Sequence, residues 1–187
     1  MAILYLIRHG KAASTWGEVQ DPGLSELGRK QAEAVANELA KIGPIPVYSS
    51  PLARAQETSL PLAQLWNCEP IIEDRVAELP NPDFDYSDSG PKHRKEWLKL
   101  VLNDQWPKLS QELQTWRQNL IDTLLGFSSD CVIFSHFVAI NVAVGEAMSN
   151  NQVVSFFPDN GSITMIESSG SELRLIEKGK EMVTKVG

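Results

Sequence analysis

Basic side chains follow three apolar runs of this 187-residue chain. Arg8 and His9 come after the first run, Arg54 follows the second after a short Ser-Pro segment, and His136 comes after the third. A guanidinium offers two parallel N–H groups to phosphate oxygens, and an imidazole can act as a nucleophile or a hydrogen-bond donor. Taken alone, Arg8 would be a surface arginine and His136 a structural histidine. Together in one pocket, these four side chains would form a concentrated anion site.

The three apolar runs predict the strands that must position these side chains. They are Ile3–Ile7, Ile45–Tyr48 and Cys131–Phe134, and each is short and nearly continuously apolar. This pattern is typical of strands buried on both faces of a parallel sheet. Ligands of such open sheets bind outside the carboxyl ends of the strands. We therefore expect the four basic side chains to share one crevice.

Helical spacing of apolar residues predicts helices between these strands. One helix is expected from an N-cap at Ser25 to Gly43-Pro44, and another from Ser50-Pro51, with Ser50 as N-cap, to Trp66. Further elements are expected at Ile71-Ile72 (edge strand), Lys92–Asn103, Pro107–Phe127 and Val138–Met148 (helices), and Ser162–Ile166 with Glu172–Ile176 (hairpin). The alternation predicts an α/β fold with three α/β/α layers around a mostly parallel sheet. The loop at 80–91 is too short for a linker, so residues 1–187 are predicted to form a single domain.

Composition excludes several classes of protein. The chain has 17 Lys and Arg against 24 Asp and Glu, a net charge of −7, which works against broad nucleic-acid binding. Cys68 and Cys131 lack the spacing of a disulfide scaffold or a zinc site. No apolar run approaches the roughly 18 residues of a membrane span, and Ala2–Ile7 lacks the flanks of an export signal. We expect a soluble cytoplasmic protein; its oligomeric state stays open.

Five segments, in order along the chain, carry a resemblance to a known family. They are Leu6–Gly10, Asp21–Gly28 with Gln31-Ala32, Ser49–Thr58, Ser135-His136 and Asn160–Ser162. The set resembles the signature motifs of the histidine phosphatase superfamily, the phosphoglycerate-mutase-like proteins. The resemblance leaves roughly residues 80–130 unaligned.

The resemblance implies a role for each basic side chain. His9 would be the nucleophile that takes a phosphoryl group onto a ring nitrogen, and it must attack as neutral imidazole. The charges of Arg8 and Arg54 would help by lowering the pKa of His9. Arg8, Arg54 and His136 would bind the phosphoryl oxygens of the transition state. Such a site needs neither a metal nor a cofactor.

A carboxyl group must protonate the leaving alkoxide and later activate water. Glu78 is the candidate, because it lies where the acid of the family usually falls. The residues after it depart from the family pattern, so Glu73, Asp83 and Asp85 also remain candidates. Phe137 is a second departure, since glycine commonly follows the second histidine, and it is expected to narrow the space beside His136.

Residues 80–127 are predicted to form a helical cap that selects the substrate. Lys92 and Arg94 belong to a basic cluster there, with His93 and Lys95, which suggests a second anionic group on the substrate. A solvated helix start would produce the same cluster.

These features predict a metal-independent phosphatase that hydrolyses a small phosphorylated metabolite through a phosphohistidine on His9. A phosphoglycerate-mutase-type phosphotransferase would use the same core residues, but the cap is short for enclosing its substrate. A phosphohistidine-protein phosphatase and a non-catalytic phosphate-binding module would also fit these residues. The sequence does not identify the phosphomonoester.

Overall fold

A six-stranded sheet forms the centre of the molecule, with the strand order β3-β2-β4-β1-β5-β6. The computed structural model describes residues 1–14, 19, 21–80 and 91–182, with side chains from residue 95 onward in the last range. The strands are β1 (Ala2–Arg8), β2 (Val47–Ser49), β3 (Ile71–Ile72), β4 (Cys131–Ser135), β5 (Ile163–Ser168) and β6 (Leu173–Glu177). The first four in spatial order are parallel, and β5 and β6 continue the sheet antiparallel. The mostly parallel sheet and the final hairpin are confirmed.

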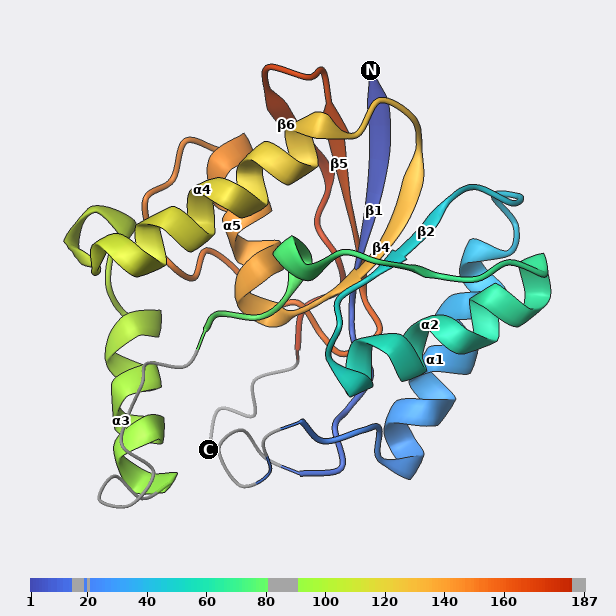
Figure 1. Cartoon of the computed structure of the whole chain (residues 1–187), viewed down its shortest axis with the longest axis horizontal. Helices are drawn as coiled ribbons and strands as arrows, with labels where there is room; N and C mark the ends of the chain where they lie inside the picture. The colour runs from blue at the N-terminus through green and yellow to red at the C-terminus, as the bar shows by residue number, and fades with distance from the viewer. Residues whose placement is uncertain (15–18, 20, 81–90, 183–187) are drawn as a thin grey trace.

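Helices cover both faces of this sheet (Figure 1). They are α1 (Glu26–Leu39), α2 (Ala53–Trp66), α3 (Pro91–Leu102), α4 (Gln111–Gly126) and α5 (Phe137–Ala147), with 3-10 turns at Asp74–Val76 and Trp106–Lys108. Side chains of β4 alternate between the two faces, as in any strand. Val132 and Phe134 pack with α1 and α2, whereas Cys131 and Ile133 pack in the core that contains α4 and α5. The three-layer α/β/α architecture is confirmed.

The first turn of α1 lies directly against the loop that follows β1. Ser25 caps this helix, as predicted, because its Oγ accepts from the backbone N–H of Gly28 at 3.1 Å. A Cβ atom on Gly28 would lie 2.2 Å from the carbonyl oxygen of Lys11, and one on Gly10 would lie 2.4 Å from the carbonyl oxygen of Gly28. Only glycine at both positions permits this approach, which fixes the backbone next to His9.

Two predicted helix starts are wrong, and α1 ends at Leu39, before the expected stop at Gly43-Pro44. The second helix begins at Ala53 with Leu52 as its N-cap, and Ser50 lies before it with a side chain engaged in a tertiary contact. The expected helix Pro107–Phe127 is a 3-10 turn followed by α4, which starts after the N-cap Ser110. Leu109 between them has an extended backbone, with φ −81° and ψ 166°. The chain therefore leaves the helical conformation there before Ser110 starts it again.

The segment predicted as a cap contains both α3 and α4. α4 packs in the core with β4, and α3 stands beyond the N-terminal end of α4 in Figure 1. Val101 near its end and Trp106 after it are buried in the core, and the Trp106 ring lies 6.0 Å from that of Trp116. Residues 81–90 of this segment lie outside the described residues. Its role as a cap over 80–127, and the single domain over 1–187, stay predictions. Among the helices described, none has the length and apolarity to cross a membrane.

Candidate active site

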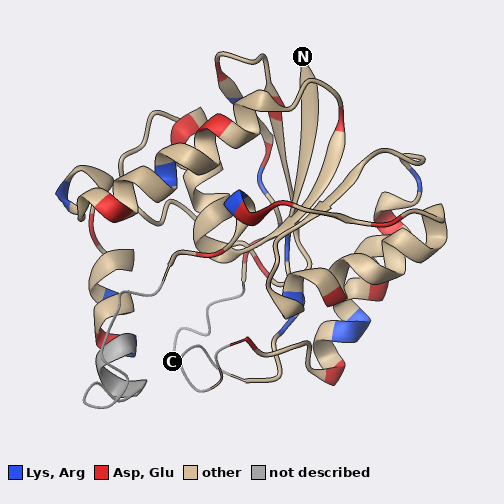
Figure 2. Cartoon of the chain, viewed as in Figure 1, with Lys and Arg blue, Asp and Glu red and all other residues tan. Residues whose placement is uncertain are grey.

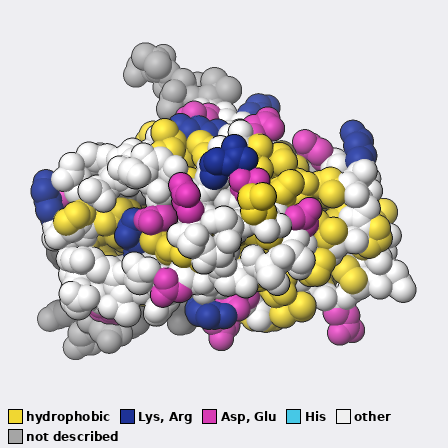
Figure 3. Space-filling model, turned by 90° about the horizontal axis from the view of Figure 1, so that it is seen from above, with side chains coloured by type: hydrophobic (Ala, Val, Ile, Leu, Met, Phe, Trp, Pro, Cys, Tyr) yellow, Lys and Arg dark blue, Asp and Glu magenta, His cyan; other side chains and the backbone are white. Residues whose placement is uncertain are grey.

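The register of the sheet brings three predicted site segments to the same level. Arg8 of β1 pairs with Ser135 of β4, and Ser49 of β2 pairs with Phe134 of β4. His9, Ser50 and His136 are therefore the first residues after three neighbouring parallel strands, and they lie side by side at the carboxyl ends of these strands. In Figure 2, blue segments lie at this lower end of the sheet, while acidic residues are spread over the helices and loops. Figure 3 views the opposite end, where no histidine of the described residues is visible.

His9 is held with one ring nitrogen unprotonated, as a nucleophile requires. Its side chain is buried, with Nδ1 2.7 Å from the carbonyl oxygen of Gly10. A carbonyl only accepts, so Nδ1 must carry the proton. Nε2 then keeps its lone pair, and it accepts from the Arg54 Nε at 3.2 Å.

Three hydrogen bonds from distant segments fix the backbone around His9. The His9 N–H donates to the Ser135 carbonyl at 3.0 Å, and the Gly10 N–H donates to the Thr58 hydroxyl at 3.0 Å. The Asn160 side-chain amide donates to the His9 carbonyl at 2.8 Å. The sequence motifs included Thr58 and Asn160 without a role, and the structure shows that both position the loop that carries His9.

The electrostatic environment keeps His9 neutral. Burial, together with the charges of Arg54 and Arg8, lowers the pKa of His9 to about 3, against the opposing bond to Gly10. Neutral imidazole is the form that can attack phosphorus.

Arg54 lies in the first turn of α2 and reaches the site from there. Its guanidinium is largely buried, and Nη1 lies 3.7 Å from the carboxylate of Asp21. Asp21 in turn accepts from the backbone N–H of Ala53 at 3.0 and 3.1 Å, which ties it to the start of the same helix. Burial lowers the pKa of Arg54, but from an initial value so high that the guanidinium stays charged.

Arg8 is fixed from two sides. Its Nη1 donates to the carbonyl of Pro158 at 2.7 Å and to the sulfur of Met182 at 3.4 Å. The other contact is the ring of Phe137, whose centroid lies 5.1 Å from the guanidinium carbon. Nothing in the sequence indicated Pro158 or Met182 as partners, because both are remote in the chain and neither is a typical anion-site residue.

The contacts of Arg8 depend on a pairing between residues 157–159 and residues 180–182. The Asp159 N–H donates to the Lys180 carbonyl at 2.7 Å, and the Met182 N–H donates to the Phe157 carbonyl at 2.9 Å. These C-terminal residues therefore brace the loop that carries Pro158.

His136 lies beside His9, with 5.1 Å between ring centroids. It is fully buried, and its Nε2 lies 2.7 Å from the Ser50 hydroxyl. Its Nδ1 has no hydrogen-bond partner within the described part of the chain. Burial lowers the pKa of His136 well below its usual value, and the neighbouring His9 and Arg54 act in the same direction.

Glu78 lies against the first turn of α5, the helix that begins directly after His136. Its carboxylate accepts from the backbone N–H groups of Leu79 at 3.0 Å and Val138 at 3.1 Å. Burial raises the pKa of Glu78, and the charges of Arg54 and Arg8 oppose the rise. A carboxyl group in this environment retains a proton to higher pH than usual.

The rival carboxylates to Glu78 lie elsewhere or outside the described residues. Glu73 pairs with Arg75 at 2.7 and 2.8 Å, and this hydrogen bonding lowers the pKa of Glu73. Asp83 and Asp85, like the side chains of Lys92 and Arg94, fall outside the described residues. The predicted contact of Lys92 and Arg94 with substrate stays a prediction.

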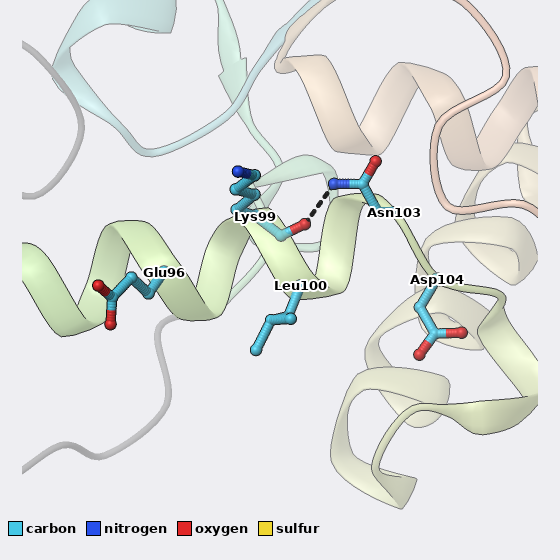
Figure 4. A pocket seen from close by; sticks show the side chains of 5 residues that line it. All are labelled: Glu96, Lys99, Leu100, Asn103 and Asp104. Atoms are coloured by element: carbon cyan, nitrogen blue, oxygen red, sulfur yellow. Dashed lines mark hydrogen bonds between the residues drawn. The ribbon is translucent and has the colours of Figure 1, made fainter.

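A surface hollow of about 520 Å³ lies along α3 and the turn after it, and none of Arg8, His9, Arg54, Glu78 and His136 lines it (Figure 4). Its lining is Glu96, Lys99, Leu100, Asn103 and Asp104. The Asn103 amide closes the helix end by donating to the Lys99 carbonyl at 2.7 Å. The mixed charges of the hollow's lining do not suit an anion.

Within the described residues, no three His, Cys, Asp or Glu side chains gather in a way that could hold a metal ion. Metal independence nevertheless stays a prediction. Two guanidiniums, two neutral imidazoles and a carboxyl group with a raised pKa can together bind a phosphoryl group, attack it and supply a proton.

This fold is that of the histidine phosphatases. Residues 4–180 match the family model of the histidine phosphatase superfamily (branch 1), and the chain belongs to this family.

Curated relatives include both phosphatases and mutases. The chain is 34% identical over 122 residues to Phosphoserine phosphatase 1 of Hydrogenobacter thermophilus, covering 62% of this chain and 51% of that protein. It is 28% identical over 158 residues to the Probable phosphoglycerate mutase GpmB of Erwinia tasmaniensis, covering 77% and 74%. The chain thus spans only about half the length of the first of these relatives.

A solved structure shares the fold over nearly the whole chain. The mycobacterial glucosyl-3-phosphoglycerate phosphatase in complex with inorganic phosphate superimposes with a TM-score of 0.72 at 19% identity, covering 97% of this chain and 98% of that one.

Proposed function

We propose that this protein is a metal-independent phosphatase that hydrolyses a small phosphorylated metabolite through a phosphohistidine on His9. One observation carries the proposal: neutral, buried His9 keeps Nε2 unprotonated beside Arg54 Nε at 3.2 Å, and its ring lies 5.1 Å from the ring of His136. Family membership and the phosphatase-named relative support the same reaction class.

The first half-reaction transfers the phosphoryl group to the protein. His9 Nε2 attacks phosphorus while the bond from phosphorus to the ester oxygen breaks. Arg8 and Arg54 balance the charge on the phosphoryl oxygens of the loose transition state. Glu78, whose pKa is raised by burial, acts in its protonated form and gives the proton to the departing alkoxide.

The second half-reaction returns the protein to its initial state. A water molecule attacks the phosphohistidine, and the Glu78 carboxylate takes the proton that the water loses. The bond from phosphorus to Nε2 breaks, inorganic phosphate leaves, and Glu78 is again protonated.

A phosphoglycerate-mutase-type transfer is the second candidate, because the mutase-named relative covers more of this chain than the phosphatase-named one. A mutase must return the phosphoryl group to its substrate before water reaches it. Free phosphate and isomerised product therefore distinguish the two reactions when both are measured on one panel of phosphorylated metabolites.

The test is turnover of an aryl phosphate, with and without chelator, by the wild-type protein and His9→Ala. We expect turnover that survives chelator and disappears in His9→Ala, while far-UV circular dichroism shows that the variant is folded. An acid-labile, base-stable phosphoprotein should be trapped in the wild type only. Phosphate binding without turnover would identify a binding module, and activity restricted to phosphohistidine proteins would identify that protein phosphatase.

A further inference from the structure

We propose that Ser50 is a positioning residue that holds neutral His136 with its proton on Nδ1, so that this atom donates to the phosphoryl group. The step toward phosphoryl binding rests on the proposed function, whereas the position of the proton does not. The relationship that carries the proposal is the 2.7 Å contact between the Ser50 hydroxyl and His136 Nε2.

The hydrogen bonds of the Ser50 hydroxyl decide its direction. Ser50 is fully buried, and its Oγ accepts from the backbone N–H of Leu52 at 3.2 Å. A hydroxyl has one proton to donate. Among the described residues, the hydroxyl has His136 Nε2 as its acceptor. Donation from Ser50 to Nε2 therefore satisfies both of these atoms.

The opposite arrangement leaves a buried donor without an acceptor. If Nε2 carried the proton, the Ser50 oxygen would accept from both Leu52 and His136, and the Ser50 hydroxyl proton would have no acceptor among the described residues. A buried polar group without a partner is costly. His136 Nδ1 lacks a partner within the described residues in either tautomer, so the Ser50 proton makes the difference, and it selects the tautomer of His136 with Nε2 unprotonated.

The selected tautomer turns His136 Nδ1 into a donor. Nδ1 is buried and has no partner within the described part of the chain, and the His136 ring lies 5.1 Å from that of His9. An anionic oxygen attached to phosphorus next to His9 Nε2 would satisfy this donor. Burial and the neighbouring cations keep the pKa of His136 low, so its second nitrogen is not protonated at neutral pH.

A neutral donor has a chemical advantage beside this nucleophile. A protonated His136 would add a third positive charge next to His9, Arg8 and Arg54, which would weaken the lone pair that attacks. A neutral Nδ1–H gives the directed hydrogen bond without that charge. The serine hydroxyl therefore lets the imidazole bind phosphate while uncharged.

Nitrogen-15 NMR of histidine-labelled full-length protein tests the tautomer directly, because the chain contains only three histidines. We expect the His136 proton on Nδ1 in the wild type, and a shift of this signal when inorganic phosphate or vanadate is added. In Ser50→Ala we expect the Nε2–H form to appear. The matched control is Ser59→Ala, which is equally buried but whose hydroxyl donates within α2 to the Gln56 carbonyl at 2.7 Å; it should keep the wild-type signal.

Kinetics test whether the contact serves the reaction. Ser50→Ala should lower kcat for an aryl phosphate about tenfold with a small effect on KM. Ser50→Thr should keep most of the wild-type kcat, because threonine keeps the hydroxyl. In a His136→Ala background, Ser50→Ala should change kcat less than twofold. Ser59→Ala should leave kcat unchanged.

A wild-type His136 with its proton on Nε2 would overturn the proposal, as would equal losses from Ser50→Ala with and without His136. If the proton lies on Nδ1 and the signal responds to phosphate, but no phosphomonoester is turned over, the proposal about Ser50 stands and the phosphatase function fails.

Discussion

The guanidinium of Arg8 lies against the ring of Phe137, 5.1 Å from its centroid. Phe137, the residue after His136, therefore holds one side of Arg8, the residue before His9. Phe137 was expected only to narrow the space beside His136, as a departure from the glycine common in the family. The structure shows that it also packs against Phe157, with 5.9 Å between ring centroids.

Phe137→Gly should weaken anion binding. Removing the ring releases one side of Arg8, and a cation–π contact contributes roughly 0.5–2 kcal/mol. The inhibition constant for vanadate should rise about 2- to 30-fold, measured by inhibition of aryl phosphate turnover. Phe157→Leu is the control, because Phe157 contacts the ring of Phe137. It should change the constant much less, and an equal change in both variants would contradict a direct role of the Arg8–Phe137 contact.

Glu78→Gln should slow substrates according to their leaving groups. Alkyl phosphates need a proton on the departing oxygen and should lose about 10²- to 10⁴-fold in kcat, whereas activated aryl phosphates should lose less than about tenfold. The paired measurement is kcat for one alkyl and one aryl phosphate. Glu73→Gln should leave both rates unchanged, since Glu73 binds Arg75. Equal slowing of the two substrates by Glu78→Gln would exclude it as the acid.

Gly28→Ala should destabilise the protein, although alanine is normally the better helix former. Its Cβ would lie 2.2 Å from the Lys11 carbonyl oxygen, so the loop that carries His9 must shift. We expect a loss of about 1–3 kcal/mol in the free energy of unfolding in urea, together with reduced kcat. Gly126→Ala is the matched change, because its Cβ meets nothing within 4 Å at the end of α4; it should stabilise by up to about 1 kcal/mol.

Stability should fall as pH is lowered from 7 to 5. The pKa of His9 is about 3 in the folded protein against 6.5 for a free side chain, so the unfolded chain binds more protons between these values. Between pH 7 and pH 5, the titration of His9 lowers the free energy of unfolding by about 2 kcal/mol. The raised pKa of Glu78 acts in the opposite direction, because protonation of this carboxyl favours the folded state.

Urea denaturation at both pH values tests this linkage. In His9→Asn the loss of stability from pH 7 to pH 5 should be smaller by about 2 kcal/mol, because the titrating group is gone. The same loss in variant and wild type would show that the pKa of His9 is near its free value.

The sequence predicted the features of this fold that depend on local pattern. The apolar runs indicated β1 and β4, and the helical spacing after Ser25 indicated α1, because burial on both faces or on one stripe leaves a periodic signal. The start of α2 was wrong, since a serine followed by proline fits an N-cap equally well whether its hydroxyl caps a helix or contacts His136. That choice depends on β4, which lies some 80 residues further along the chain.

The candidate site was likewise predicted where it depends on local pattern and missed where it depends on distant contacts. Arg8, His9, Arg54 and His136 were predicted together because parallel strands end at one edge of the sheet. The supporting contacts of Arg8 were not, because Pro158 and Met182 become its neighbours only through the pairing of two irregular segments. Such a pairing has no periodic signature in the sequence.

This pairing has a consequence for synthesis on the ribosome. A nascent chain that has emerged through His136 already contains the nucleophile and both guanidiniums, yet Arg8 still lacks the backbone carbonyl and the sulfur that hold it. The contacts that hold Arg8 are therefore complete only when residues 180–182 have been synthesised and have paired with residues 157–159.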